Sequence, residues 1–185
     1  NLGERQMQTT GKFLAWLLLA GFAFWMDGAI AQTTSIKTEY LGTLYAPLDA
    51  PQVIDNSLFI YNVQPGGWFK GPKLNAAVLQ PAADWLRVMP AGNARLDVRL
   101  TLKTDDDQLI YVTYNGIISH SKDSFDRLMK GEVLTSKDFY FITAPTMQTA
   151  SEKYAWVNHV QAVGKVVEVK AGEGSYVKYD LFIVR

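Results

Sequence analysis

The sequence predicts an all-β fold, an antiparallel β-barrel of short strands, from three observations. From Lys37 onward, apolar and polar residues alternate with a period of two along most of the chain. Short runs rich in Val, Ile, Tyr, Phe, Leu and Thr are separated by Gly, Pro, Asn and Asp, which favour turns. Eleven such runs are too many for one open sheet, and closing the sheet removes its exposed edges. A β-sandwich is the alternative, and we favour the barrel.

The strands are assigned from this alternation, and turn-forming residues support the breaks between them. Three aspartates in the turn Thr104–Gln108 lack the ligand spacing, central glycine and distal glutamate of a calcium loop, so we expect a solvated hairpin tip. Pro90–Asn93 and Gly172–Gly174 are expected to be hairpin turns as well. The expected strands are Lys37–Tyr45, Leu58–Val63, Gly67–Lys73, Ala76–Leu79, Asp84–Met89, Ala94–Lys103, Leu109–Ile118, Phe139–Thr143, Tyr154–Val163, Lys165–Lys170 and Ser175–Val184.

One segment, Ser119–Asp138, departs from the strand pattern. Phe125, Leu128 and Met129 have helical spacing, with Asp123 as a cap before them and Gly131 after them. The sequence therefore predicts a helix of about two turns inside a long connection. This connection either closes one mouth of the barrel as a lid or crosses the surface without a gating role.

The first 31 residues are predicted to be a cleaved secretory signal. Phe13–Met26 is an uncharged apolar run, and Ala29–Ala31 forms an A-x-A cleavage pattern ahead of Gln32. The 14 residues of this run fall short of the roughly 20 needed to span a bilayer. A retained membrane anchor is therefore the weaker alternative. We expect export to a bacterial periplasm or beyond, and a single domain over residues 32–185.

Composition excludes several classes of function. Lys and Arg together number 18, and Asp and Glu together also number 18, so there is no basic footprint for nucleic acid. Cysteine is absent, which excludes disulfides, thiol catalysis and thiolate metal sites. His120 and His159 have no motif-placed partners, so we expect neither a metal nor any other cofactor.

The segment Ala94–Lys103 carries charge on one face and aliphatic side chains on the other. Asp97 and Arg99 share the charged face, about 6.5 Å apart between Cα atoms. Arg99 is predicted to hold or polarise a ligand oxygen, with Asp97 beside it in the binding site. The alternative is a structural salt bridge between the two.

Asp84 is the candidate for proton transfer. It and Trp85 point to opposite sides of their strand, so only one of them faces the interior. Apolar walls around Asp84 would raise its pKa toward neutral pH and make it a general acid or base. The alternative is a structural acid paired with Arg99 or with backbone amides.

Tyr154, Trp156 and Asn158 share one face if Tyr154–Val163 is a strand. Two rings and an amide suit a planar, partly oxygenated ligand, and we expect Arg99, Trp156 and Asn158 to meet in the barrel lumen. In the alternative, the rings fill the core and Asn158 binds backbone. Lys73 is a further candidate for substrate binding. The segment around it is no phosphate loop, because Pro72 stands where the lysine of that motif should be.

Several fragments follow one another in the order and spacing of a known family, namely Gly71–Leu74, Pro81–Trp85, Leu96–Arg99, Thr104–Asp106, Tyr140–Phe141, Pro145 and Tyr154–Asn158. Together they resemble the family called domain of unknown function 3237, or UPF0311, over nearly the whole mature chain. The resemblance implies a compact β-barrel, commonly a dimer, whose members mostly lack an assigned activity. Some fungal relatives are implicated in cyclising natural products by adding a hydroxyl across an alkene. The chain departs from the family pattern at Ala82–Ala83, at Asp107–Gln108 and at Asn75.

These observations predict an exported barrel that binds a small, largely apolar, oxygen-bearing molecule. It would catalyse cofactor-free proton transfer, such as isomerisation, lyase action or ring closure, with Asp84 moving the proton. The alternative is a carrier or sensor that uses the same cavity without turnover. In a third class the surface of a dimer is the function, and the barrel is packed solid.

Overall fold

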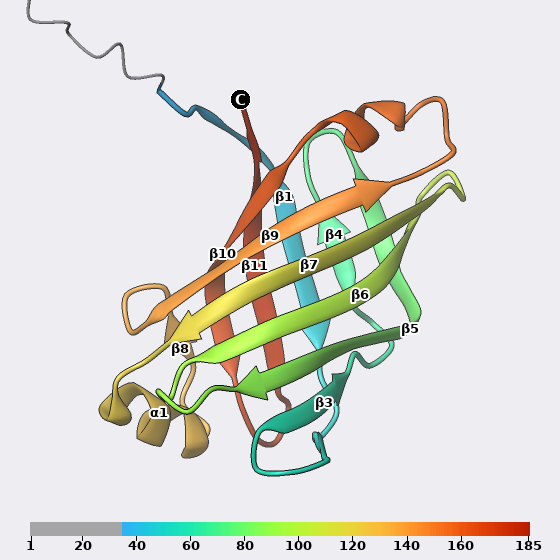
Figure 1. The fold of residues 1–185 in the computed structure, drawn as a ribbon. Coiled ribbons are helices and arrows are strands. Elements are labelled where there is room, and N and C mark those ends of the chain that lie inside the picture. The colour runs from blue at the N-terminus through green and yellow to red at the C-terminus, as the bar shows by residue number, and fades with distance from the viewer. Residues whose placement is uncertain (1–34) are drawn as a thin grey trace, which may run out of the picture. The chain divides into compact units, whose positions relative to one another are not determined.

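The chain forms one sheet that closes into an antiparallel barrel, and its strands bury every second side chain in the interior (Figure 1). The computed structural model describes residues 35–185, and eight strands close the barrel. Their order is β5, β4, β1, β11, β10, β9, β7 and β6, which pairs again with β5. The predicted barrel is therefore confirmed. The eight strands are β1 (Thr38–Pro47), β4 (Trp68–Lys70), β5 (Asn75–Val88), β6 (Ala94–Thr104), β7 (Leu109–Ser119), β9 (Tyr140–Gln148), β10 (Ala162–Lys170) and β11 (Tyr176–Val184).

Three short strands flank the barrel. These are β2 (Gln52–Val53), β3 (Leu58–Asn62) and β8 (Leu134–Thr135). Strand β3 pairs with the second half of β5, and β8 pairs with β10. Two helices complete the described part of the chain, α1 (Lys122–Met129) and the 3-10 helix η1 (Ala155–His159). Neither is long and apolar enough to cross a membrane. The predicted leader, residues 1–31, lies outside the described residues.

The two strands predicted at Ala76–Leu79 and Asp84–Met89 are one strand, β5. Pro81 suggested a break because it cannot donate a ladder hydrogen bond. The pairing of β5 with β6 shifts register between Leu79 and Ala83, and this irregularity accommodates the proline. The first half of β5 pairs with β4 and the second half with β3.

The predicted strand Tyr154–Val163 is wrong. Residues Ala155–His159 form η1, and β10 begins only at Ala162. The Asn158 side chain explains the difference, because it binds both backbone groups of Thr149. Its Oδ1 accepts from the Thr149 N–H at 2.8 Å and its Nδ2 donates to the Thr149 carbonyl at 2.9 Å. Val157 is fully buried at the centre of this turn.

Inward side chains fill the barrel with an apolar core. On β6 and β7 the inward positions are almost fully buried, and they alternate with exposed or partly exposed positions. Three aromatic rings from β7, β9 and β11 meet edge to face inside. Tyr179 lies 6.1 Å from Tyr114 and 5.2 Å from Phe141 between ring centroids. These contacts place two tyrosine hydroxyls in an otherwise apolar interior.

Helix α1 is present as predicted, but its cap and its buried face differ. Ser121 is the N-cap, accepting from the Ser124 N–H at 3.1 Å, so the cap predicted at Asp123 is wrong. Phe125 and Met129 are 43% and 64% exposed. Ser124 is buried instead, because its hydroxyl donates to the Asp138 carbonyl at 2.7 Å.

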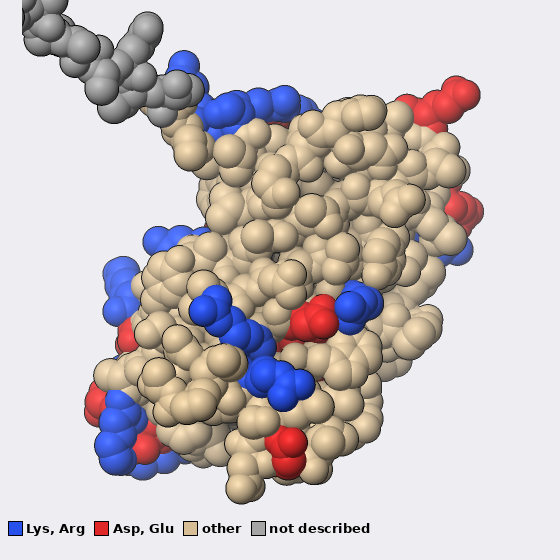
Figure 2. Space-filling view, in the orientation of Figure 1, with Lys and Arg blue, Asp and Glu red and all other residues tan. Residues whose placement is uncertain are grey.

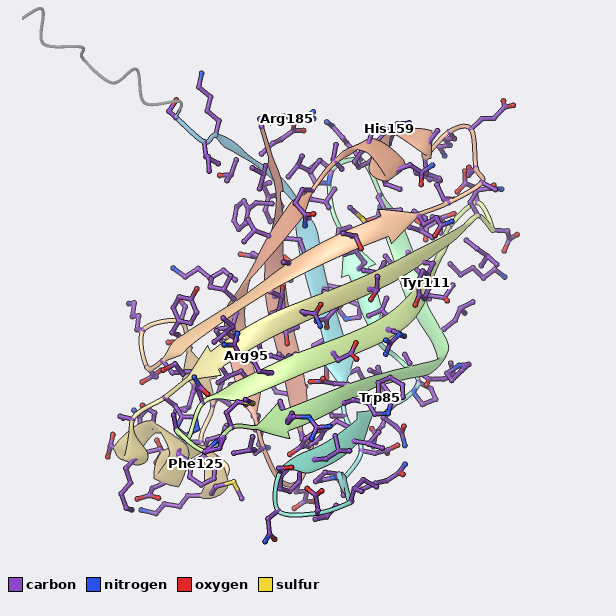
Figure 3. The ribbon with its side chains drawn as sticks, viewed as in Figure 1. Trp85, Arg95, Tyr111, Phe125, His159 and Arg185 are labelled. Atoms are coloured by element: carbon purple, nitrogen blue, oxygen red, sulfur yellow. The ribbon has the colours of Figure 1, made fainter. Side chains whose placement is uncertain are left out.

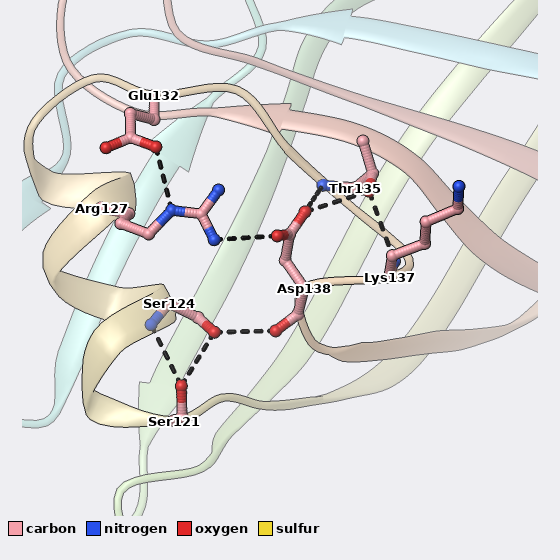
Figure 4. A network of polar contacts seen from close by, with 7 residues as sticks. All are labelled: Ser121, Ser124, Arg127, Glu132, Thr135, Lys137 and Asp138. Atoms are coloured by element: carbon pink, nitrogen blue, oxygen red, sulfur yellow. Dashed lines mark hydrogen bonds and ion pairs between the residues drawn. The ribbon is translucent and has the colours of Figure 1, made fainter.

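A polar network fastens α1 to the turn that precedes β9 (Figure 4). Arg127 donates to Asp138 Oδ1 and to Glu132 Oε2, each at 2.9 Å. Asp138 Oδ2 accepts from the Thr135 N–H at 2.8 Å, and these bonds hold the Asp138 pKa below its usual range, the Thr135 backbone bond most of all. Because these bonds hold α1 in place, they favour a connection that crosses the surface without a gating role over a lid that opens and closes the barrel.

Removing this carboxylate should loosen the helix without loosening the barrel. In Asp138→Ala we expect the α1 amide protons to exchange roughly tenfold faster, because the helix loses its anchor at Arg127. Hydrogen exchange followed by NMR measures this. Lys137→Ala is the control, since only its backbone joins the network. Unchanged α1 exchange in Asp138→Ala would contradict the role of the network.

Candidate functional site

A row of directly opposed residues crosses four strands on the inner side of the barrel. Tyr61 on β3 faces Asp84 on β5, Asp84 faces Val98 on β6, and Val98 faces Tyr114 on β7. Opposed residues of antiparallel strands point to the same side of the sheet. Val98 and Tyr114 are buried in the core, so Asp84 and Tyr61 also point inward.

The Asp84 carboxyl is the group in this row whose protonation matters. Its pKa is raised to about 7, chiefly because burial disfavours the charged form, and the charge of Asp97 raises it further. One hydrogen bond opposes this shift, from the Asp97 backbone N–H to Asp84 Oδ1 at 3.1 Å. Within residues 35–185 no basic side chain forms an ion pair with Asp84. The expected direction of its pKa shift is therefore found. Of the two pairings in the structural alternative, the one with a backbone amide is present and the one with Arg99 is not.

Three tyrosines lie close enough to this carboxyl for its charge to affect their pKa values. The charge of Asp84 contributes to raising the pKa of Tyr61, Tyr114 and Tyr179, although burial is the larger cause for each. Tyr114 and Tyr179 are buried and hydrogen-bonded to each other, whereas Tyr61 is partly exposed. All three hydroxyls stay protonated at neutral pH. The site is thus an acid poised near neutrality among hydroxyl donors.

Sequence reasoning missed these tyrosines as neighbours of Asp84. Tyr114 shares its strand face with Ile110 and Val112, which correctly indicates a core position. Its closeness to Asp84 depends on the pairing register of β5, β6 and β7, and a single strand does not reveal that register. The sequence around Tyr61 and Tyr179 predicts strands, but nothing in it indicates that either residue lies near Asp84.

Asp97 and Arg99 lie on the outer face, so the expectation that Arg99 reaches the lumen is wrong. Arg99 Nη1 lies 3.1 Å from Asp97 Oδ1, and both side chains are about half exposed, at 50% and 43%. The Arg99 guanidinium also lies over the Trp85 ring, 5.5 Å from its centroid. Because the aliphatic face of β6 is the one that fills the core, the charged face must meet solvent.

The remaining candidates gather around η1 and do not share a face. Tyr154 is buried and its hydroxyl donates to Asp106 Oδ1 at 3.0 Å. Trp156 packs partly against the core, and Lys73 Nζ lies 5.8 Å from its ring centroid while pairing with Glu39. Asn158 binds the Thr149 backbone. His159, which ends η1, lies at the upper end of the barrel in Figure 3, far from Trp85.

The structure therefore separates the seven predicted site residues into two places. Asp84, Asp97 and Arg99 lie on β5 and β6, with Asp84 inside and the other two outside. Lys73, Tyr154, Trp156 and Asn158 lie at η1 and its neighbours, where their contacts are those of the structural alternatives. A meeting of Arg99, Trp156 and Asn158 is excluded, because η1 replaces the predicted strand and Arg99 faces outward.

The contacts of Asn158 lead to a stability prediction. Asn158→Ala removes two hydrogen bonds to the Thr149 backbone and is expected to lower the free energy of unfolding by about 1 kcal/mol. Urea unfolding measures the difference. His159→Ala, an exposed neighbour, serves as the control. A variant as stable as the unmodified protein would mean that these bonds contribute nothing.

Comparison with known proteins identifies relatives of the whole domain. A family model described as a protein of unknown function (DUF3237) matches residues 36–184. A UPF0311 protein of Clostridium acetobutylicum is 34% identical over 95 residues, which are 51% of this chain and 60% of that protein. The chain thus spans less than two thirds of that relative. A UPF0311 protein of Rhodopseudomonas palustris is 27% identical over 135 residues, 71% of this chain and 88% of the relative.

Solved structures share the fold. A conserved protein of unknown function from Rhodopseudomonas palustris superposes with a TM-score of 0.72 at 25% identity, covering 83% of this chain and all of that one. A β-barrel-like protein from Acinetobacter baumannii gives 0.66 at 28% identity, with 84% and 99% covered. An enzyme from Penicillium herquei gives 0.55 at 18% identity, with 84% and 98% covered, and shows the fold alone.

Proposed function

This chain belongs to the family of proteins of unknown function DUF3237, or UPF0311, and we propose that its barrel binds a small, largely apolar, oxygen-bearing molecule and moves a proton on it. One observation carries the proposal. Asp84 has a pKa of about 7, faces the apolar interior and forms no ion pair among the described residues. A carboxyl with no structural partner but one backbone amide costs stability, and such groups concentrate at sites that use them.

Asp84 and Tyr61 divide the proposed chemistry between them. Asp84 near neutral pH takes a proton from a hydroxyl or from a carbon next to a carbonyl, and returns it at another atom of the same molecule. Tyr61 is opposite Asp84 and partly exposed, so its hydroxyl can donate to a ligand oxygen. The polarising role predicted for Arg99 thus falls to Tyr61. Isomerisation, lyase action and ring closure all need only these two groups, without a cofactor.

Small molecules retained through native purification test this proposal. Mass spectrometry of the protein should detect an apolar, oxygen-bearing molecule, and incubation should convert it. Asp84→Asn should keep the molecule and lower turnover by about 10²- to 10⁴-fold, whereas Tyr61→Phe should weaken turnover less. Retention without conversion by the unmodified protein would identify the carrier or sensor instead. Absence of any retained molecule would contradict both the proton transfer and the carrier.

The proposal includes export and assembly as a homodimer. Export is supported by the apolar run and the A-x-A pattern in residues 1–31. Amino-terminal sequencing of the protein from a periplasmic fraction should begin at Gln32. Light scattering of the mature chain should give twice the monomer mass.

A further inference from the structure

The outer face of the barrel carries a hollow that the proposed proton transfer does not use. Its volume is about 360 Å³, and it lies over β5 and β6 beside the start of β3. Figure 2 shows basic side chains gathered around an acidic one on this face, and Figure 3 shows Trp85 and Arg95 there. The lining side chains include Leu58, Trp85, Arg87, Arg95, Asp97 and Arg99.

Charge in this hollow is unbalanced. Arg87 and Arg95 are direct partners across the β5–β6 ladder, and like charges in directly opposed positions destabilise a sheet. Neither forms an ion pair with another residue of the 35–185 segment. The positive charge of Arg87 also helps to lower the pKa of the nearby Asp55 carboxyl, as the smallest of several causes. Among the side chains that line the hollow, three guanidinium groups stand against one carboxylate, so an anion can compensate the excess positive charge.

An apolar wall stands beside these charges. Trp85 is 38% exposed, although tryptophan is usually well buried, and Leu58 at the edge of β3 is partly exposed. The Arg99 guanidinium lies over the Trp85 ring and is neutralised by Asp97. Arg99 is therefore already partnered, and Arg87 and Arg95 remain to bind an anion.

We propose that this hollow is a binding site for a small aromatic carboxylate. Planar arginine forks match a carboxylate with two parallel hydrogen bonds, so the acid group lies between Arg87 and Arg95. Its ring lies against Trp85 and Leu58. A volume of about 360 Å³ is at the lower end for small-molecule sites, which fits one compact acid. Asp84 is on the other side of the sheet and takes no part in this binding.

Titration with 2-naphthoate, followed by NMR and calorimetry, tests the site. We expect saturable binding that shifts the amide signals of β5 and β6 around Trp85. Arg87→Gln and Arg95→Gln should each weaken binding about tenfold, since each removes a charge-assisted hydrogen bond. Lys165→Gln, which removes an exposed positive charge on β10, should leave the affinity unchanged. The neutral 2-naphthamide should bind at least tenfold more weakly.

Four outcomes would overturn the site. These are no saturation at 10 mM naphthoate, equal binding of naphthamide, equal effects of Lys165→Gln and Arg95→Gln, or displacement by inorganic phosphate at equal concentration. Thermal melting of each variant confirms that it is folded. Asp84→Asn should bind naphthoate as the unmodified protein does, so failure of this site and failure of the proposed proton transfer are separate results.

Discussion

Replacing Asp84 with Asn is expected to make the protein more stable at pH 8, by up to about 4 kcal/mol, and to change little at pH 3. The carboxyl has a pKa of about 7 in the folded protein against an ordinary value of 3.8. Each pH unit of this difference corresponds to about 1.4 kcal/mol. Asparagine stays neutral, and its side-chain oxygen can still accept from the Asp97 N–H.

The sign follows from proton binding. Between about pH 4 and pH 7 the folded protein holds a proton on Asp84 that the unfolded chain has lost, so stability falls as the pH rises through this window. Above pH 7 the loss is complete. Urea unfolding at pH 3, 5 and 8 measures it for the unmodified protein, for Asp84→Asn and for the exposed control Asp123→Asn. Parallel pH profiles for the unmodified protein and Asp84→Asn would show that Asp84 is not desolvated.

Gly71→Ala is expected to destabilise the barrel by about 3 kcal/mol. Gly71 follows the end of β4, where the backbone lies against β1 too closely to leave room for a methyl group. A Cβ atom at Gly71 would overlap the Leu41 carbonyl oxygen and lie 2.9 Å from the Gly42 Cα atom. These are backbone atoms, which cannot rotate away. Strand β4 pairs with β1 at only three positions, from Lys70 to Trp68, so the strands separate there first.

Gly172→Ala separates crowding from backbone strain. Gly172 has φ of +80°, and an added Cβ atom meets nothing within 4 Å. This substitution therefore costs only the left-handed conformation, about 1 kcal/mol. Urea unfolding compares the two variants. Equal losses would mean that the close approach at Gly71 does not limit the barrel.

The strands could be predicted wherever burial alternates and a turn residue ends the run. The segment expected at Ala94–Lys103 is strand β6, Ala94–Thr104, almost residue for residue. Prediction failed at Tyr154–Val163 because alternation there is accidental. The bonds from Asn158 to Thr149 fold this segment into η1, and they join residues whose proximity the sequence does not express.

The candidate site could be predicted only in part, for a related reason. The aliphatic face of β6 already identified Leu96, Val98 and Leu100 as the interior, which sends Asp97 and Arg99 outside. The expectation that Arg99 faces the lumen contradicted this alternation. The surroundings of Asp84 depend on strand register, which is set across β3, β5, β6 and β7 together, so Tyr61 and Tyr114 could not be assigned to it beforehand.

The proposed proton transfer depends on the raised pKa of Asp84, and titration of this carboxyl tests the proposal most directly. Carboxyl ¹³C chemical shifts of Asp84, assigned by comparison with Asp84→Asn, give its pKa in the folded protein. A midpoint near pH 7, accompanied by shifts of the Tyr61 and Tyr114 signals, is the predicted result. A midpoint near pH 4 would show that Asp84 is an ordinary solvated carboxylate, and the proposed proton transfer would be contradicted.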